Sequence, residues 1–301
     1  MSKPYRIISF DGGGIRGILT LTILSRLMSE FPNLINGCDL LTGTSTGGII
    51  ALGLADGVGV KKLIDLYYNH GKDIFKRRLT FWGLCGCKYT NKGLKKLLND
   101  MFLDKKLGDL SKKVLVPAFD LDNNDSKNRR WKPKFFDNIR ADEPDNKQLI
   151  RDVCLYTSAA PTYFPTVDGY IDGGVCANNP SSAALAKVLD EEVMGRKIGQ
   201  DNIKLLSIGT GRGIQYISDK DLKWGAVRWS SKIFNILFEG LIDIPDYLCG
   251  HALDGNYKRV NYQFPEGELP DLDDWKAVDH LMAAGEEVDL APVVEWIKNV
   301  W

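Results

Sequence analysis

The chain has 301 residues, 44% of them hydrophobic, which is enough to bury a large core. Lysine plus arginine and aspartate plus glutamate both total 39, so the zero net charge argues against a nucleic-acid polymer as partner. The six cysteines are scattered without metal-ligand spacing, so we expect no disulfide framework, no metal and no cofactor. The chain shows neither a signal-peptide pattern nor an apolar run of membrane-spanning length, which predicts a soluble cytoplasmic protein. Its oligomeric state is not predicted.

A strand followed by a glycine-rich loop opens the chain. Residues 5–10 form a β-rich run, the segment DGGGIRG follows at 11–17, and apolar residues then recur at helical spacing. Such a loop presents consecutive N–H groups to an anion at a helix N-terminus. The loop therefore predicts an anion-binding site.

Two functions compete for this loop. Gly12, Gly14 and Gly17 have the spacing of a dinucleotide-binding fingerprint, which also needs an acidic residue at the end of the second strand. Asp39 lies at the right distance but begins its apolar run instead of ending it. We favour an oxyanion hole, in which the N–H groups of Gly12, Gly13 and Gly14 stabilise the charge that develops in acyl transfer.

A second glycine cluster surrounds a serine. In the segment LTGTSTGG at 41–48, Ser45 is flanked two residues each way by Gly43 and Gly47, with apolar residues on both sides. This pattern is typical of a nucleophile elbow, a sharp strand-to-helix turn that exposes the serine hydroxyl at a helix N-terminus. We expect Ser45 to be a nucleophile beside the glycine loop.

The remaining elements alternate and predict a doubly wound, mainly parallel α/β sheet flanked by helices. Helical spacing is found at 60–75, 91–102, 149–157, 183–193 and 293–301, and buried strands are predicted at 114–119 and 203–208. A helical apolar stripe runs through 224–249, for which a packed core is the default interpretation. We expect a single domain over 1–301, with a motif-bearing core at about 5–215 and a helical part at about 216–301.

Three motifs, in order, resemble those of the patatin-like phospholipases: the glycine loop at 11–17, the serine elbow at 43–47 and the segment DGG at 172–174. Secondary matches lie at 68–71, 157–165, 178–180 and 207–211, so the resemblance covers roughly residues 5–215.

The resemblance implies a lipid acyl hydrolase of phospholipase A type that uses a Ser-Asp dyad. Ser45 is then the nucleophile, and Asp172 takes its proton and returns it to the leaving alcohol. An aspartate of ordinary pKa, about 3.9, is a weak base, so Asp172 must be partly desolvated. The residues expected to support the two loops and the dyad are Arg16, Gly17, Gly43, Gly47, Gly173 and Gly174. Asp11 should brace the glycine loop, and Arg16 either binds a lipid phosphate or forms an ion pair.

Alternatives remain at this point. A general α/β-hydrolase esterase would use Ser45, Asp172 and then His251 or His280. A nucleotide-binding module and a non-catalytic lipid-binding protein are further candidates, and some bacterial patatin-like enzymes are activated by small signalling nucleotides. His70 is interpreted as a packing or hydrogen-bonding histidine.

Contact with a membrane surface should be local. Basic clusters at 76–78 and 127–134 lie beside Trp82 and Trp131, a combination that suits a lipid surface. Solvated loops are the simpler interpretation of each cluster.

Overall fold

The computed structural model describes residues 3–78, 86–214, 216–218 and 223–301. Seven strands of these residues form one sheet, in the order β4-β3-β2-β1-β6-β7, with β5 paired to β3. The strands are β1 (Tyr5–Phe10), β2 (Leu40–Gly43), β3 (Lys113–Asp120), β4 (Lys132–Asp137), β5 (Tyr170–Asp172), β6 (Ile203–Ile208) and β7 (Tyr257–Val260). Neighbours are parallel except β3–β4 and β3–β5, so the predicted mainly parallel α/β sheet is confirmed.

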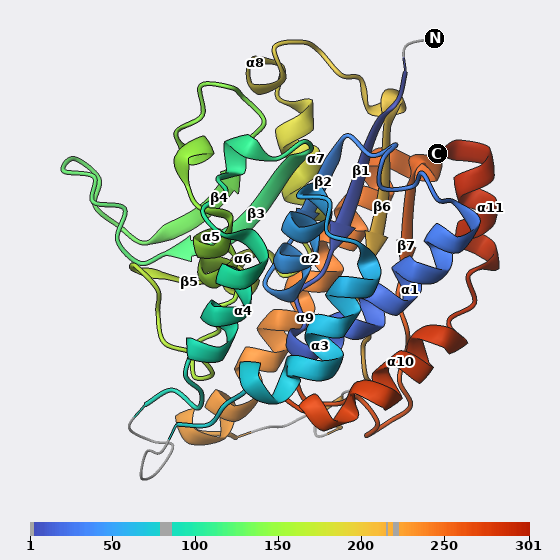
Figure 1. The fold of residues 1–301 in the computed structure, drawn as a ribbon. Helices are drawn as coiled ribbons and strands as arrows, with labels where there is room; N and C mark the ends of the chain where they lie inside the picture. The colour runs from blue at the N-terminus through green and yellow to red at the C-terminus, as the bar shows by residue number, and fades with distance from the viewer. Residues whose placement is uncertain (1–2, 79–85, 215, 219–222) are drawn as a thin grey trace.

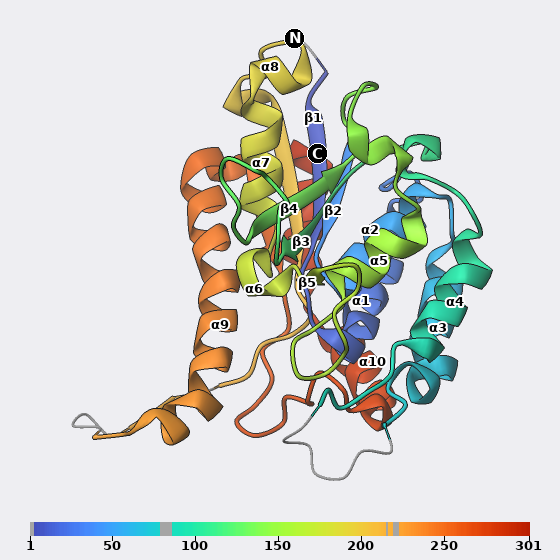
Figure 2. The same cartoon turned by 90° about the vertical axis from the view of Figure 1, so that its left-hand side faces the viewer.

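Helices cover both faces of the sheet. One face carries α1 (Gly17–Glu30), α2 (Thr46–Ala55), α3 (Val60–Ile74), α4 (Lys92–Phe102), α5 (Ile150–Thr157), α10 (Val278–Glu287) and α11 (Ala291–Val300). The other face carries α7 (Ser181–Leu189) and α9 (Ala226–Leu253), as Figure 1 and the turned view of Figure 2 show. The short helices α6 (Gly174–Ala177) and α8 (Glu191–Met194) lie beside α7 in the chain.

The two cores follow from the alternation of side chains along β1. Ile8 and Phe10 are fully buried under the α1 face, while Tyr5 and Ile7 are buried under α7 and α9. Because both faces of the strand are covered, most of its residues are apolar, with Arg6 and Ser9 as the exceptions.

The C-terminal part departs from the predicted helical tail. Its strand β7 pairs in parallel with β6 and extends the sheet. The helix expected over 183–193 is also interrupted, because α7 ends at Leu189 and the Asp190 carboxylate accepts the N–H groups of Glu192 and Val193 to begin α8. Strand β7 has four residues, YKRV, and lacks the apolar run by which the central strands can be predicted from the sequence.

Helix α9 contains an internal proline that fixes where it docks. Pro245 has no N–H to donate to the carbonyl of Leu241, four residues earlier. The backbone N–H of Asn179 donates to that carbonyl at 3.2 Å, and the Asn179 side chain donates to the carbonyl of Ile242 at 3.2 Å. The segment that follows the Asp172 motif therefore anchors α9 at its proline. No helix among the described residues is long and apolar enough to cross a bilayer.

Candidate active site

Ser45 occupies a strained turn between β2 and α2. Its backbone has φ 54° and ψ −119°, a region that residues with a side chain rarely adopt. A Cβ on Gly43 would run into the backbone of Gly47, and one on Gly47 would run into the carbonyl of Phe10. Glycine is required at both positions because the helix and two strands approach each other there. This geometry is that of a nucleophile elbow.

Thr157, at the end of α5, connects the elbow to its surroundings. Its hydroxyl oxygen accepts the Ser45 N–H at 2.9 Å and donates its own proton to the Pro117 carbonyl at 2.6 Å. Its carbonyl accepts the Gly173 N–H at 3.2 Å. One threonine thus connects the serine turn, strand β3 and the Asp172 motif. The sequence placed Thr157 in a matching motif but did not indicate this role.

Asp172 ends β5 and is 3% exposed. Burial raises the pKa of its carboxyl to about 7, while hydrogen bonds from the Gly174 N–H, at 2.7 Å, and from the Ser45 hydroxyl act in the opposite direction. A Cβ on Gly173 would meet the Pro117 backbone, so the turn after Asp172 packs directly on β3. The carboxyl is therefore hydrogen-bonded to the serine and is far more basic than an exposed aspartate.

The glycine loop presents fewer N–H groups than the sequence suggested. The Gly12 N–H donates to the Asn178 carbonyl at 2.9 Å, so it is already used within the fold. Gly13 and Gly14 line the same cavity as Ser45, and Gly14 has φ 58°. A Cβ on Gly13 would lie 2.6 Å from the Cβ of Thr210, which excludes larger residues. The N–H groups of Gly13 and Gly14 are thus the two that remain candidates for an oxyanion hole.

Asp11 and Arg259 brace the loop from beneath. The Arg259 guanidinium contacts the Asp11 carboxylate at 2.5 Å and donates to the Ser207 hydroxyl at 2.7 Å. Burial lowers the pKa of Arg259, but the charge of Asp11 raises it overall. Asp11 is 1% exposed, so this is a buried pair between the loop and β7. The expected bracing role of Asp11 agrees with this contact, and its partner was missed.

Arg16 and Gly17 begin α1 next to the site. Arg16 is 9% exposed, lines the cavity and donates through Nε to the Gly13 carbonyl at 3.4 Å. Burial lowers the pKa of its guanidinium, and the charge of Glu239 is the largest opposing influence. A Cβ on Gly17 would meet the Thr46 side chain, so glycine lets α1 approach α2 closely.

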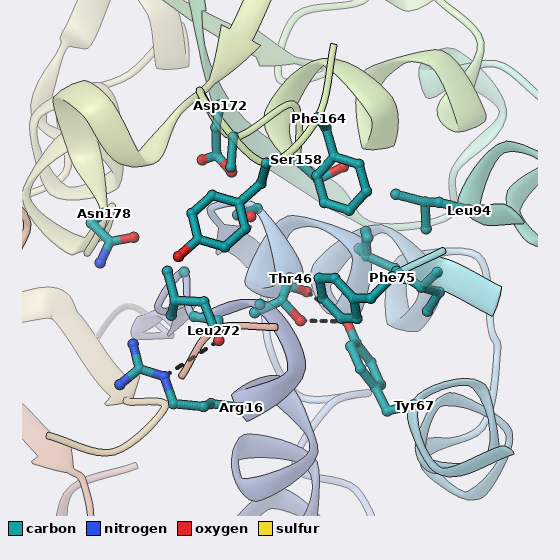
Figure 3. A pocket seen from close by; sticks show the side chains of 18 of the residues that line it. Arg16, Thr46, Tyr67, Phe75, Leu94, Ser158, Phe164, Asp172, Asn178 and Leu272 are labelled. Carbon is teal, nitrogen blue, oxygen red and sulfur yellow. Dashed lines mark hydrogen bonds between the residues drawn. The ribbon is translucent and has the colours of Figure 1, made fainter. Parts of the chain in front are cut away.

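The cavity has a polar end and an apolar end. With its open mouth it encloses about 820 Å³. Figure 3 shows Asp172, Asn178 and Arg16 on one side and apolar side chains on the other. The apolar lining comes from Ile49, Leu66, Ile74, Phe75, Leu94 and Phe164. The arrangement can hold a polar group near the serine and an apolar chain beyond it.

The histidines lie elsewhere. None of His70, His251 and His280 is among the residues that line the cavity of Ser45 and Asp172. His70 pairs with Asp73 at 3.6 Å on α3, and His251 contacts the Tyr247 carbonyl on α9. The Ser-Asp-His alternative therefore has no histidine in position.

The other sequence predictions have mixed outcomes. Asp39 stands before β2 and accepts the Arg6 N–H at 2.9 Å, at the wrong end of the strand for a dinucleotide ribose. Trp131 is 72% exposed on the loop before β4. Trp82, part of the other proposed membrane cluster, lies outside the described residues.

Comparison with known proteins identifies the family to which the motifs belong. The family model described as "Patatin-like phospholipase" matches residues 8–185, so the chain belongs to the patatin-like phospholipase family. Among curated relatives, it is 31% identical to a "cGAMP-activated phospholipase" of Pseudomonas aeruginosa, over 92% of this chain and 83% of the relative. It is 34% identical to "Protein teg" of Priestia megaterium, over 80% of this chain and 73% of the relative. A solved structure, VipD from Legionella pneumophila, matches with 13% identity and a TM-score of 0.40, over 94% of this chain and 67% of VipD.

Proposed function

We propose that this protein is a lipid acyl hydrolase of phospholipase A type that cleaves carboxylic esters of membrane lipids through a Ser45–Asp172 dyad. The observation that carries the proposal is the hydrogen-bonded, buried Asp172 beside a serine in an elbow. Its carboxyl has a pKa of about 7, which suits a general base at neutral pH. Membership of the patatin-like phospholipase family supports the lipid substrate.

In the proposed reaction, Ser45 Oγ attacks the ester carbonyl carbon while the Asp172 carboxylate accepts the hydroxyl proton. The N–H groups of Gly13 and Gly14 stabilise the oxyanion of the tetrahedral intermediate. The intermediate collapses as Asp172 returns the proton to the leaving alcohol. Water then attacks the acyl group on Ser45 with Asp172 again as base, which releases the fatty acid and restores the serine.

The shape of the cavity supports an acyl chain as the part of the substrate that is bound. Its apolar side chains come from α2, α3, α4 and the loop after α5, and they lie beyond the serine. Burying methylene groups there contributes about 0.8 kcal/mol for each CH₂. Arg16 lies at the polar end, where it can face a phosphate or the ester oxygen.

A panel of phospholipids, glycerolipids and short-chain esters tests this function, with Ser45→Ala as the inactive control. A serine-reactive fluorophosphonate should label Ser45. Ser158 also lines the cavity, but its hydroxyl donates to the Cys154 carbonyl at 2.6 Å, so Ser158→Ala should still be labelled. Ester turnover that survives Ser45→Ala would refute the proposal.

The glycine loop has its own test. Gly13→Ala places a methyl group against Thr210, displaces the loop and should lower kcat by about 10²–10³, the usual effect of losing one oxyanion donor. The matched control is Gly59→Ala, because nothing lies close to the Cβ position of Gly59 and its φ is not positive. Gly57 has the same open space but a positive φ, which would strain an alanine there. An unchanged kcat in folded Gly13→Ala would move the oxyanion hole elsewhere.

A nucleotide activator is a second proposal, favoured by one observation. The Pseudomonas relative named a cGAMP-activated phospholipase aligns with 92% of this chain. Initial rates on phospholipid vesicles with and without cGAMP test it directly. A rate that does not change at saturating nucleotide would leave the hydrolase proposal intact and remove the activator.

A further inference from the structure

Helix α9 leaves a large apolar surface uncovered. Its exposed apolar side chains form two groups, at 233–237 and 244–248, and helical geometry places both groups on one side of the helix. We name these residues the α9 apolar stripe: Ile233, Ile236, Leu237, Ile244, Tyr247 and Leu248. Every one of them is more than 40% exposed. Scattered exposed apolar residues need no explanation, whereas six of them on one side of a single helix mark an interaction surface.

The carboxylates of the same helix point to a different side. Asp243 pairs with Arg212 at 3.3 Å, and Asp246 accepts a hydrogen bond from the Tyr257 hydroxyl at 2.7 Å. Glu239 is partly buried, and its charge acts on Arg16. The acidic residues at positions 239, 243 and 246 are thus directed at the rest of the protein. The stripe itself contains no carboxylate.

The stripe borders the cavity of Ser45 and Asp172. Phe238 lines that cavity, and the next residue back in the helix, Leu237, is 57% exposed. Consecutive residues of a helix point about 100° apart, so one turn of α9 contacts both the cavity and solvent. Figure 2 shows α9 along the edge of the fold, with its first turns extending outward at the end where the parallel strands finish. This is the end at which the elbow and the glycine loop lie.

Aromatic and basic residues border the stripe at this end. The rings of Trp224 and Trp229 lie 5.3 Å apart, and the Arg228 guanidinium lies 5.0 Å from the Trp224 ring. Lys223 and Arg228 are exposed. Tryptophan with lysine or arginine beside an apolar helix face is the composition of helices that lie in a membrane interface.

We propose that the α9 apolar stripe, with its tryptophan and basic border, is the surface through which this protein docks on a lipid bilayer. The inference rests on the proposed lipid acyl hydrolase function, because a membrane lipid must enter the cavity that both Ser45 and Phe238 line. The proposed surface replaces the basic cluster at 127–134 that the sequence suggested. In that cluster Arg129 already pairs with Asp122, and Lys134 pairs with Asp145. If α9 lies in the interface, the cavity that Phe238 lines is held next to the bilayer.

The test is binding to vesicles of equal parts phosphatidylcholine and phosphatidylglycerol. The double variant Ile233→Ser/Leu237→Ser removes two exposed apolar side chains without touching the cavity lining. Its vesicle partition coefficient should fall by at least about tenfold, because two apolar side chains that would be buried in the interface are replaced by small polar ones. Trp131→Ser is the control, because it removes a still more exposed apolar side chain on the β3–β4 loop, and this variant should bind like the native protein.

Activity separates this inference from the proposed function. The double variant should turn over a soluble short-chain ester at the native rate and lose activity only on vesicles. Unchanged vesicle binding in the double variant, or an equal loss in Trp131→Ser, would overturn the docking surface. A native dimer that Ile233→Ser/Leu237→Ser converts to a monomer would also overturn it, by making the stripe a contact between copies. No turnover of any soluble ester by the native protein would instead refute the hydrolase.

Discussion

Replacing Asp172 with asparagine should inactivate the enzyme and, at neutral and alkaline pH, stabilise its fold. The carboxyl is buried, and its pKa rises from 3.8 in a free chain to about 7 in the fold. A group whose pKa is raised on folding favours the folded state fully only below the unfolded value, and this contribution is lost as pH rises through the folded value. Above pH 7 the folded protein therefore holds a carboxylate that burial disfavours.

The magnitude follows from the size of the shift. A rise from 3.8 to about 7 corresponds to about 4 kcal/mol at high pH, at 1.36 kcal/mol per pH unit. Asparagine keeps an oxygen that can accept the Gly174 N–H but carries no charge. With an unfolding entropy of about 2.1 cal/mol/K per residue over 301 residues, the expected gain in Tm is about 6 °C.

Thermal unfolding of both proteins from pH 4 to pH 9 provides the measurement. The Tm difference should be small at pH 4, increase from about pH 4 to about pH 7, and then level off. Asp142→Asn is the matched control, because Asp142 is exposed and paired with Arg140, so its replacement should give no gain at high pH. If the Tm difference between Asp172→Asn and the native protein is the same at every pH, the pKa of Asp172 is not raised. The argument that Asp172 is basic enough to accept the serine proton then fails.

Further outcomes are expected at the site and its brace. In the native enzyme, kcat/KM should rise with pH through about 7 as Asp172 loses its proton, so a limb in this range does not indicate histidine. Accordingly, His251→Gln and His280→Gln should keep kcat within about twofold, and a folded histidine variant without activity would favour the Ser-Asp-His alternative. Arg259→Leu leaves the buried Asp11 without its partner and should lower the free energy of unfolding, measured by urea titration, by about 3–5 kcal/mol. An unchanged urea midpoint would show that the Asp11–Arg259 pair does not stabilise the fold.

The parts of the site that could be predicted are those with a local cause. The strand, tight turn and helix around Ser45 require glycine at 43 and 47 whatever the rest of the chain does, so the elbow is visible in five residues. The glycine loop is visible for the same reason. Asp172 could be assigned only through its motif, because an isolated Asp-Gly-Gly is a common turn.

Contacts between distant segments could not be predicted. Nothing at Thr157 indicates that its hydroxyl accepts the Ser45 N–H from a segment 112 residues away. The use of the Gly12 N–H by Asn178 is a property of packing, and it reduces the expected oxyanion donors from three to two. Likewise the apolar residues of α9 have ordinary core periodicity, and only the fold shows that many of them are exposed.

The brace between Asp11 and Arg259 also determines when the site is assembled during synthesis. The two residues are 248 positions apart, and β1 pairs with β6 across a gap of almost 200 residues. A ribosome releases the elbow early, yet the glycine loop has no buried cation beneath it until β7 has been made. Contacts of such long range form slowly, because most of the chain must be ordered before they close. A chain that has been translated only as far as the elbow therefore carries Ser45 beside a glycine loop without its buried partner, and this loop gains its support only after β7 has been made.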